Sequence, residues 1–136
     1  MPTLSKDDLN HTQDSTVAIL GNLEQLIVNL NHTAMEYLRN DQFAMAIRLL
    51  RKAEEHLLKV NEQISDFKEG AESIGDQFFL EGSGLTTLES LKNELLGLTY
   101  NNLGCVCKQS EDFLGALDFL KKALVYESAH EKKEQD

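Results

Sequence analysis

Apolar residues recur every three or four positions along most of the chain, which is the spacing of one face of an α-helix. The first such stripe begins near Ser15, where Asp14 or Ser15 can cap a helix, and it ends at the turn signal Arg39-Asn40-Asp41. Its members are Val17, Leu20, Leu23, Ile27, Leu30, Ala34 and Tyr37. The pattern predicts one long helix over residues 15–39, preceded by a mobile polar segment over residues 1–14.

A second stripe predicts a helix over residues 42–68 with a charged outer face. The stripe holds Phe43, Ala46, Ile47, Leu50, Ala53, Leu57, Val60, Ile64 and Phe67. Four glycines between Glu69 and Gly84 oppose a continuous helix, so residues 69–84 are expected to form an acidic loop inserted in the helical domain. The apolar centre of this loop, Phe78-Phe79-Leu80, either closes the end of the bundle or docks on a partner or on the protein's own groove.

Two further helices are predicted after the loop. The sequence Thr86-Thr87-Leu88-Glu89 fits a helix N-terminus with a capping box, and the apolar stripe that follows ends near Gln109. Asp112 is a good N-cap for the last helix, which is expected to run to about Lys132, before a polar tail over residues 133–136. The predicted fold class is therefore all-α, with four long helices arranged as two antiparallel hairpins in a superhelix or bundle.

The sequence repeats itself at an offset of 70 residues. Small residues recur at equivalent places, with Ala34 matching Gly104 and Ala46 matching Ala116. The other matched pairs are Leu30 with Tyr100, Tyr37 with Cys107, Phe43 with Phe113, Ile47 with Leu117, Leu50 with Leu120, and Ala53 with Ala123. Small residues that face one another allow two helix axes to approach within about 8–10 Å, while large residues fill the space around them.

The second copy resembles a tetratricopeptide repeat (TPR), whose pattern is aromatic-x2-Leu-Gly-x2-Tyr, then Ala-x3-Phe, then Ala and Pro. Here the pattern reads Tyr100-x2-Leu103-Gly104-x2-Cys107, Ala116-x3-Leu120 and Ala123, with Ser128 in place of proline. The first copy is weaker and reads Leu30-x2-Thr33-Ala34-x2-Tyr37, Phe43, Ala46-x3-Leu50 and Ala53. The offset is about twice the usual TPR spacing. We therefore expect the second and third helices to overrun the motif and to pair as an extended hairpin.

TPR proteins bind peptide segments of other proteins along the surface formed by the first helix of each repeat. The resemblance therefore implies a non-catalytic scaffold or adaptor that holds a peptide or helix of a partner in such a groove. Carried over by position, the partner-binding residues are Asn31, Met35, Leu38, Arg39, Leu98, Asn101, Cys105, Lys108 and Gln109. Phe78 and Phe79 are additional candidates for a contact made by the loop.

One residue of the second copy bears on the kind of partner that the resemblance implies. Asn102 matches an asparagine that some TPR proteins use to clamp a chaperone's terminal carboxylate, but the lysines of that clamp are absent from the first copy. Asn102 is therefore expected to hydrogen-bond within its repeat rather than to bind a chaperone.

The alternative function is a helical assembly domain, which packs within a larger complex or forms a homodimer that buries Leu20, Leu23 and Ile27.

Charge and composition narrow the kinds of partner. The net charge of −10 over 136 residues argues against nucleic acid and against anionic membrane surfaces. It either makes a neutral or basic protein partner easier to accommodate or serves solubility alone. No signal peptide and no membrane span are predicted, because the chain lacks an N-terminal apolar segment and any run of 18 apolar residues. Cys105 and Cys107 point to different sides of a helix and should not pair, a pattern that indicates a reducing, cytoplasmic setting.

No catalytic constellation stands out in the sequence. The histidines His11, His32, His56 and His130 share no metal-ligand spacing. Gly82-Ser83-Gly84 is not followed by the Gly-Lys-Ser/Thr of a phosphate loop. Cys107 is expected to be a buried apolar residue, and Cys105 is expected to face the groove. The sequence therefore predicts a protein that is not an enzyme and that carries no metal and no cofactor.

Overall fold

The computed structural model describes residues 6–74 and 83–135, and within them the side chains of residues 18–69 and 86–129. The described residues form four α-helices: α1 (Lys6–Arg39), α2 (Phe43–Ile74), α4 (Ser83–Gln109) and α5 (Phe113–Gln135). The predicted all-α fold with four long helices is confirmed.

The outer ends of the helices differ from the sequence prediction. Helix α1 begins at Lys6 rather than near Ser15, so most of the segment expected to be mobile is helical. Helix α5 likewise continues to Gln135 rather than ending near Lys132. These extensions are polar turns with no apolar stripe, and stripes are what the prediction detects. At the end of α5 these residues are lysine, glutamate and glutamine, which are good helix formers, and at the start of α1 the acidic residues Asp7 and Asp8 stabilise the first turn of a helix.

The inserted loop is also shorter than predicted at both of its ends. Helix α2 continues through residues 69–74, since a single glycine within a helix costs only about 1 kcal/mol relative to alanine. Helix α4 begins at Ser83, so Thr86 lies inside the helix and the predicted capping box does not mark its N-terminus. Phe78, Phe79 and Leu80 lie outside the described residues.

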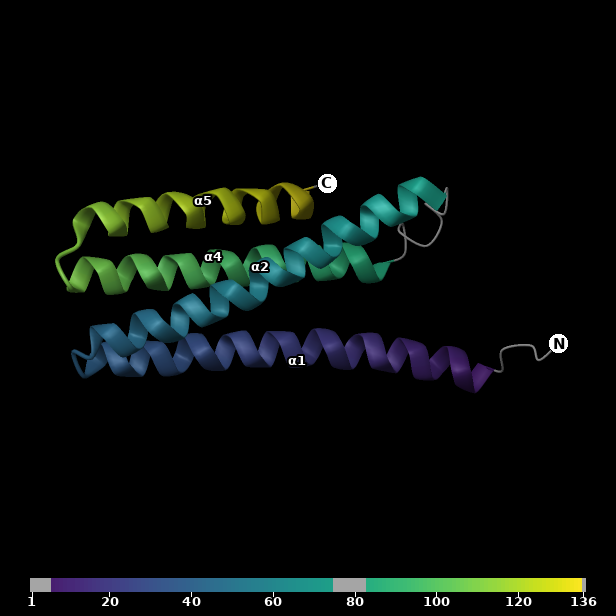
Figure 1. Ribbon diagram of the computed structural model, residues 1–136, viewed down its shortest axis with the longest axis horizontal. Helices are drawn as coiled ribbons and strands as arrows, with labels where there is room; N and C mark the ends of the chain where they lie inside the picture. Colours follow the sequence, from purple (N-terminus) through teal and green to yellow (C-terminus); the bar gives the residue numbers. More distant parts are fainter. Residues whose placement is uncertain (1–5, 75–82, 136) are drawn as a thin grey trace.

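Helix α4 lies at the centre of the molecule and contacts each of the other three helices (Figure 1). It lies between α1 and α5, and α2 crosses in front of α1 and α4. The two interhelical turns lie at the same end of the molecule, so α1 and α4 run parallel to one another. Towards its C-terminal end α2 diverges from α1, and Phe67, which was expected in the buried stripe, is 55% exposed there.

The two interhelical turns share one backbone geometry at the offset of 70 residues. The second residue after each first helix, Asp41 or Glu111, has a left-handed backbone with φ of 60° or 68°. Both turns contain the two hydrogen bonds of a Schellman motif. These bonds run from Asp41 N to Leu38 O (3.0 Å), Gln42 N to Tyr37 O (2.9 Å), Glu111 N to Lys108 O (3.2 Å) and Asp112 N to Cys107 O (2.8 Å). The structure thus contains the same helical hairpin twice.

The small residues lie where the helices approach most closely. All the matched alanines are buried: Ala34, Ala46, Ala53, Ala116 and Ala123. A Cβ atom on Gly104 would come within 2.8 Å of the Leu120 side chain, which is closer than carbon atoms normally approach. Glycine at this position therefore permits the close packing of α4 against α5, as the sequence pattern predicted.

Candidate functional site

A polar network joins α1 to α4 at their buried junction. Asn31 is 3% exposed, and its amide nitrogen donates hydrogen bonds to the Ile27 carbonyl (2.9 Å) and to Thr99 Oγ1 (3.0 Å). Its Oδ1 accepts a hydrogen bond from Asn102 Nδ2 at 2.8 Å, and Thr99 Oγ1 donates to the Leu95 carbonyl at 2.8 Å. Because the amide of Asn31 bonds through both its nitrogen and its oxygen, the network fixes the relative position of the two helices.

This network corrects two expectations about individual residues. Asn102 was expected to bond within its own repeat, but it bonds to the other hairpin. Asn31 and Leu38 were expected to line a partner-binding groove, but each is only 3% exposed and faces the protein's own interior. Both residues are covered because α1 packs against neighbouring helices at these positions. A partner protein therefore has no access to them in this structure.

The other predicted groove residues remain accessible. Arg39, Asn101, Lys108 and Gln109 are exposed, and Leu98 is 39% exposed. Met35 and Cys105 are half-buried. Since α1 and α4 lie side by side and parallel, these side chains can belong to one surface formed by the first helices of the two hairpins.

This surface carries the same order of residue types in α1 and in α4. Along one side, each helix carries an acid, an aliphatic residue, an asparagine, a sulfur-containing residue and then a base. In α1 they are Glu24, Val28, Asn31, Met35 and Arg39, and in α4 they are Glu94, Leu98, Asn101, Cys105 and Lys108. Asn31 lies buried beneath this surface, and the position equivalent to Arg39 is Gln109, one residue after Lys108. We call the other nine residues the α1/α4 face.

The repetition extends to the exposure of the aliphatic pair. Val28 is 41% exposed and Leu98 is 39% exposed. Equivalent positions of the two hairpins thus place aliphatic side chains of similar exposure on the same side of the molecule. The sequence prediction missed Glu24, Val28 and Glu94, although applying the 70-residue offset to polar and exposed positions would have found them.

Charged and aromatic side chains from three helices meet at another junction. Tyr100 of α4 stacks on Phe119 and on Tyr126 of α5, with ring centroids 6.1 and 5.8 Å apart. Arg51 of α2 lies 4.8 Å from the centroid of Phe119 and pairs with Glu54 at 2.8 Å. Burial, together with a hydrogen bond to Glu54, raises the pKa of Tyr100. The hydroxyl therefore remains protonated at neutral pH and holds α4 to α2.

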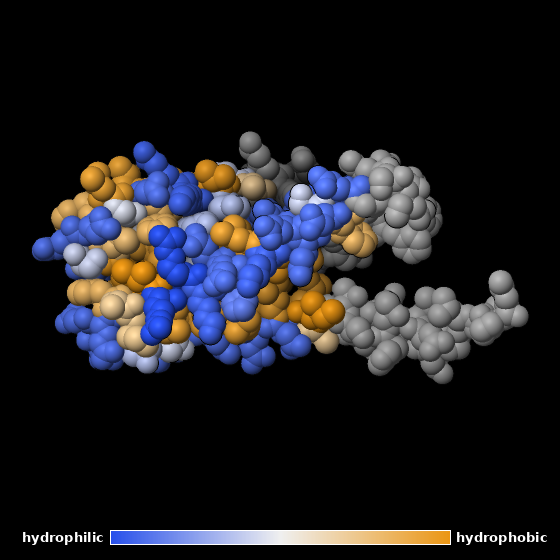
Figure 2. Space-filling view, viewed as in Figure 1, coloured by the Kyte–Doolittle hydropathy of each residue, from blue (hydrophilic) through white to orange (hydrophobic). Residues whose placement is uncertain are grey.

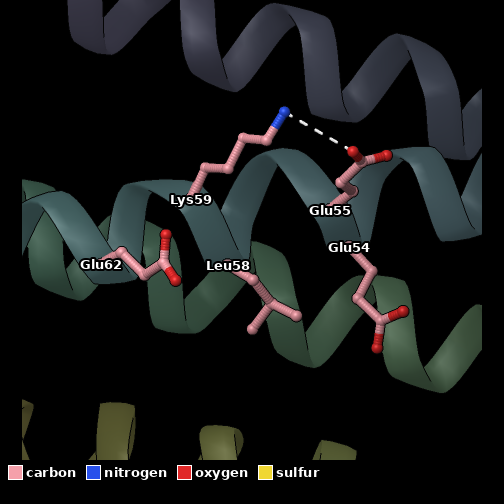
Figure 3. A pocket seen from close by; sticks show the side chains of 5 residues that line it. All are labelled: Glu54, Glu55, Leu58, Lys59 and Glu62. Carbon is pink, nitrogen blue, oxygen red and sulfur yellow. Dashed lines mark ion pairs between the residues drawn. The ribbon is translucent and has the colours of Figure 1, made fainter.

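A shallow hollow of about 430 Å³ lies on α2 beside this junction. Its lining residues are Glu54, Glu55, Leu58, Lys59 and Glu62. Figure 3 shows Glu54, Leu58 and Glu62 pointing toward α4, while Glu55 and Lys59 point to the opposite side and pair at 3.5 Å. Ligand sites usually combine apolar walls with convergent polar groups. A hollow lined by one helix and three carboxylates does not build such a site.

The remaining candidate chemistry is limited to single groups. Within the described side chains, no group of three or more His, Cys, Asp and Glu residues could hold a metal ion. None of the helices, as far as they are described, is long and apolar enough to cross a membrane. Cys107 is 4% exposed, and burial raises the pKa of its thiol. A buried, protonated thiol is a poor nucleophile, so Cys107 acts as a packing residue, as the sequence predicted.

Comparisons with protein-family models, with curated proteins and with solved structures gave no match for this chain. The resemblance to TPR proteins therefore stays a prediction from the sequence.

Proposed function

We propose that this protein is a non-catalytic interaction module that holds a peptide segment or helix of a partner protein on the α1/α4 face. The observation that carries the proposal is the repetition of an acid, an exposed aliphatic residue and a sulfur-containing residue at equivalent positions of α1 and α4, followed in each helix by a base. The resemblance of both hairpins to TPR units points to the same surface. A scaffold or adaptor in the cytoplasm is the role that fits this reading.

The chemistry of the face suggests how a partner would be held. Val28 and Leu98 offer accessible apolar contact, and the half-buried Met35 adds a flexible side chain that adapts to different shapes. Asn101 is exposed, and its side-chain amide can both donate to and accept from an extended peptide backbone. These groups suit a peptide that alternates apolar side chains with free backbone groups.

The charges on the face would orient that peptide. Glu24 and Glu94 lie toward one end of the face, and Arg39 and Lys108 lie toward the end that holds the turns. A partner segment with basic residues near the glutamates and acidic residues near the turns would bind in one direction only. The net charge of −10 makes the basic part of the partner the stronger contributor to long-range attraction.

The alternative of a homodimer through the stripe of α1 is less well supported. That dimer would have to bury Ile27, but Ile27 is already completely buried in the core of the single chain. Leu20 and Leu23 are half-buried as well. These side chains therefore contribute to the stability of the monomer rather than to a surface.

The chain offers a closely matched pair of variants to test the α1/α4 face. Leu98 on this face is 39% exposed, and Leu58 on α2 is 40% exposed, so glutamate at either position should cost similar stability. Affinity capture from native cells should recover the same proteins with wild type and with Leu58→Glu, and should lose them with Leu98→Glu. Equal recovery with both variants would contradict the proposal.

A photo-crosslinking amino acid at Asn101 gives a second, direct readout. The side chain is exposed, so the replacement should leave the fold intact. Crosslinked partner peptides identified by mass spectrometry should come from one contiguous segment of each partner. Crosslinks scattered over the partner's surface would indicate that Asn101 merely lies near the partner and does not bind it.

A further inference from the structure

The outer side of α5 exposes an unusual amount of apolar surface. Eleven large apolar side chains are exposed within the described part of the chain, and five of them lie on this helix. They are Phe113 (65% exposed), Leu114 (84%), Leu117 (52%), Leu124 (62%) and Val125 (66%). Apolar side chains also reach the surface at the end of the molecule that holds the two turns, whereas hydrophilic residues follow α2 (Figure 2). We call the five residues on α5 the α5 face.

The first hairpin shows what the equivalent face of α2 meets. There, Phe43 and Ile47, the counterparts of Phe113 and Leu117, are half-buried against the core, and Glu54, the counterpart of Leu124, is half-buried too, because α4 packs on α2. Among the described residues, no helix packs on α5 in the corresponding place. The α5 face is therefore built like a helix-packing surface that has no partner within the described chain.

Helices α2 and α5 differ in a second stripe of residues, which lies beside Phe43 and Ile47 on α2 and beside Phe113 and Leu117 on α5. In α2 it consists of Ala44, Arg48, Arg51 and Glu55, all of which are exposed. In α5 the equivalent residues are Leu114, Asp118, Lys121 and Val125. Packing within the chain does not require apolar residues here, because α2 has none larger than alanine. Leu114 and Val125 therefore need an explanation outside the described part of the chain.

The α5 stripe is self-complementary: its residues, read in one direction, can pair with the same residues read in the opposite direction. The spacings of four, three and four residues read the same in both directions, with an apolar residue at each end and one charge of each sign between. When a second helix lies antiparallel to the first, Leu114 lies opposite Val125, and Asp118 lies opposite Lys121. A two-fold axis midway along the stripe produces each of these pairs twice.

We infer that the α5 face binds the α5 face of a second copy of this chain, as an antiparallel helix pair about a two-fold axis. Phe113, Leu117 and Leu124 line one edge of the contact. The Asp118 carboxylate already pairs with Lys122 of its own helix at 3.5 Å, but its side chain is 66% exposed. One of its oxygens can therefore accept from Lys121 of the second copy. None of these residues belongs to the α1/α4 face, so the inference is independent of the proposed function.

Sedimentation equilibrium of the full chain, from about 1 μM to about 500 μM, tests the inference. Wild type should show a concentration-dependent rise to twice the mass of one chain. Leu114→Asp should weaken the dimer by at least about 100-fold, since each dimer loses both apolar contacts between Leu114 and Val125. Leu58→Asp on α2 serves as the control and should dimerise like wild type, and circular dichroism should show equal helix content in all three proteins. A wild-type chain that remains monomeric throughout, or equal loss in both variants, overturns the inference.

Exchange of the two charges tests the antiparallel register. Asp118→Lys and Lys121→Asp should each weaken the dimer by about tenfold, because each variant places like charges opposite one another twice. An equimolar mixture should form a heterodimer with near wild-type affinity, since opposite charges then face one another at both pairs. The difference in affinity between the separate variants and their mixture should shrink in about 1 M salt. A mixture that dimerises no better than the separate variants overturns the register and with it the two-fold pairing.

Discussion

The two hairpins, α1–α2 and α4–α5, are built on one plan but stand in different surroundings. Both turns are Schellman motifs at an offset of 70 residues, and both hairpins have buried alanines at the matched positions. The second helix of the first hairpin is covered by α4, whereas the described chain leaves the same side of α5 uncovered. A single pattern of residues thus gives a core in one hairpin and an open surface in the other.

The matched asparagines show the same difference on a smaller scale. Asn31 is 3% exposed because Thr99 and Asn102 of α4 enclose it, while Asn101 is exposed because the described chain places no helix beside it. The role of a residue in a repeat therefore depends on its position within the repeat and also on which side of the repeat has a neighbour.

The largest expected effect comes from the matched leucines of the two second helices. Leu50 has no exposed surface, whereas Leu120 is only half-buried. Leu50→Ala should lower the free energy of unfolding by about 4 kcal/mol, because it leaves a closed cavity, and Leu120→Ala should lower it by about 2 kcal/mol. Urea denaturation of both variants measures the difference. Equal losses would show that the two hairpins are covered alike, and would break the comparison.

A smaller effect is expected at two helical glycines whose surroundings differ. Gly104 packs against Leu120, whereas a Cβ atom on Gly21 would meet nothing within 4 Å. Gly104→Ala should destabilise the protein by about 1–2 kcal/mol through overpacking, even after the gain in helix propensity. Gly21→Ala, the control, should stabilise it by about 0.5–1 kcal/mol. Stabilisation by both changes, again measured in urea, would contradict the close approach of α4 to α5.

The residues that precede the two second helices, Gln42 before α2 and Asp112 before α5, are expected to differ by about 1 kcal/mol in their contribution to the stability of the protein. The Asp112 carboxylate caps α5 by accepting a hydrogen bond from the Gly115 amide at 3.0 Å, whereas the structure describes no side-chain cap from Gln42 on α2. Asp112→Ala should therefore cost about 1 kcal/mol, while Gln42→Ala should be nearly neutral. Thermal unfolding followed by circular dichroism can resolve this difference. A loss of similar size at Gln42 would mean that both helices are capped by side chains.

Sequence reasoning succeeded where a feature depends on residues close together in the chain. The turns before Phe43 and Phe113, the cap at Asp112 and the small residue at Gly104 all follow from local spacing and local chemistry. The repeat identified equivalent positions on α1 and α4, but the repeat alone could not show that α4 encloses Asn31.

The features that sequence reasoning missed depend on distant neighbours or on the absence of a signal. The helical turns near Lys6 and Ile74 carry no apolar stripe, so the pattern gave no reason to extend α1 and α2 to these residues. The exposure of Phe113 and Leu117 could not be predicted, because the same apolar spacing describes a helix covered on one side or on two. Only the arrangement of all four helices separates these cases.

The smallest expected effect concerns Tyr100. Its counterpart in the first hairpin is Leu30, whose side chain has no group that can titrate. Burial and the hydrogen bond to Glu54 raise the pKa of Tyr100 in the folded protein, so above about pH 10 the unfolded chain loses this proton first. The unfolded state then binds fewer protons than the folded state, and stability falls as pH rises through this range. The contribution of Tyr100 is complete below about pH 9 and should fall by somewhat under 1 kcal/mol by about pH 10.5.

Urea denaturation of wild type and Tyr100→Phe at several pH values isolates this contribution from the other groups that titrate in the same range. The variant loses the hydrogen bond to Glu54 and should therefore be less stable than wild type at pH 8. The two curves should converge as pH rises above about 10, because wild type alone loses the contribution of Tyr100. Parallel curves would mean that the hydroxyl ionises equally easily in the folded and unfolded chains. In that case burial at the junction of α2, α4 and α5 would not distinguish Tyr100 from an exposed tyrosine, and this part of the contrast between the hairpins would be lost.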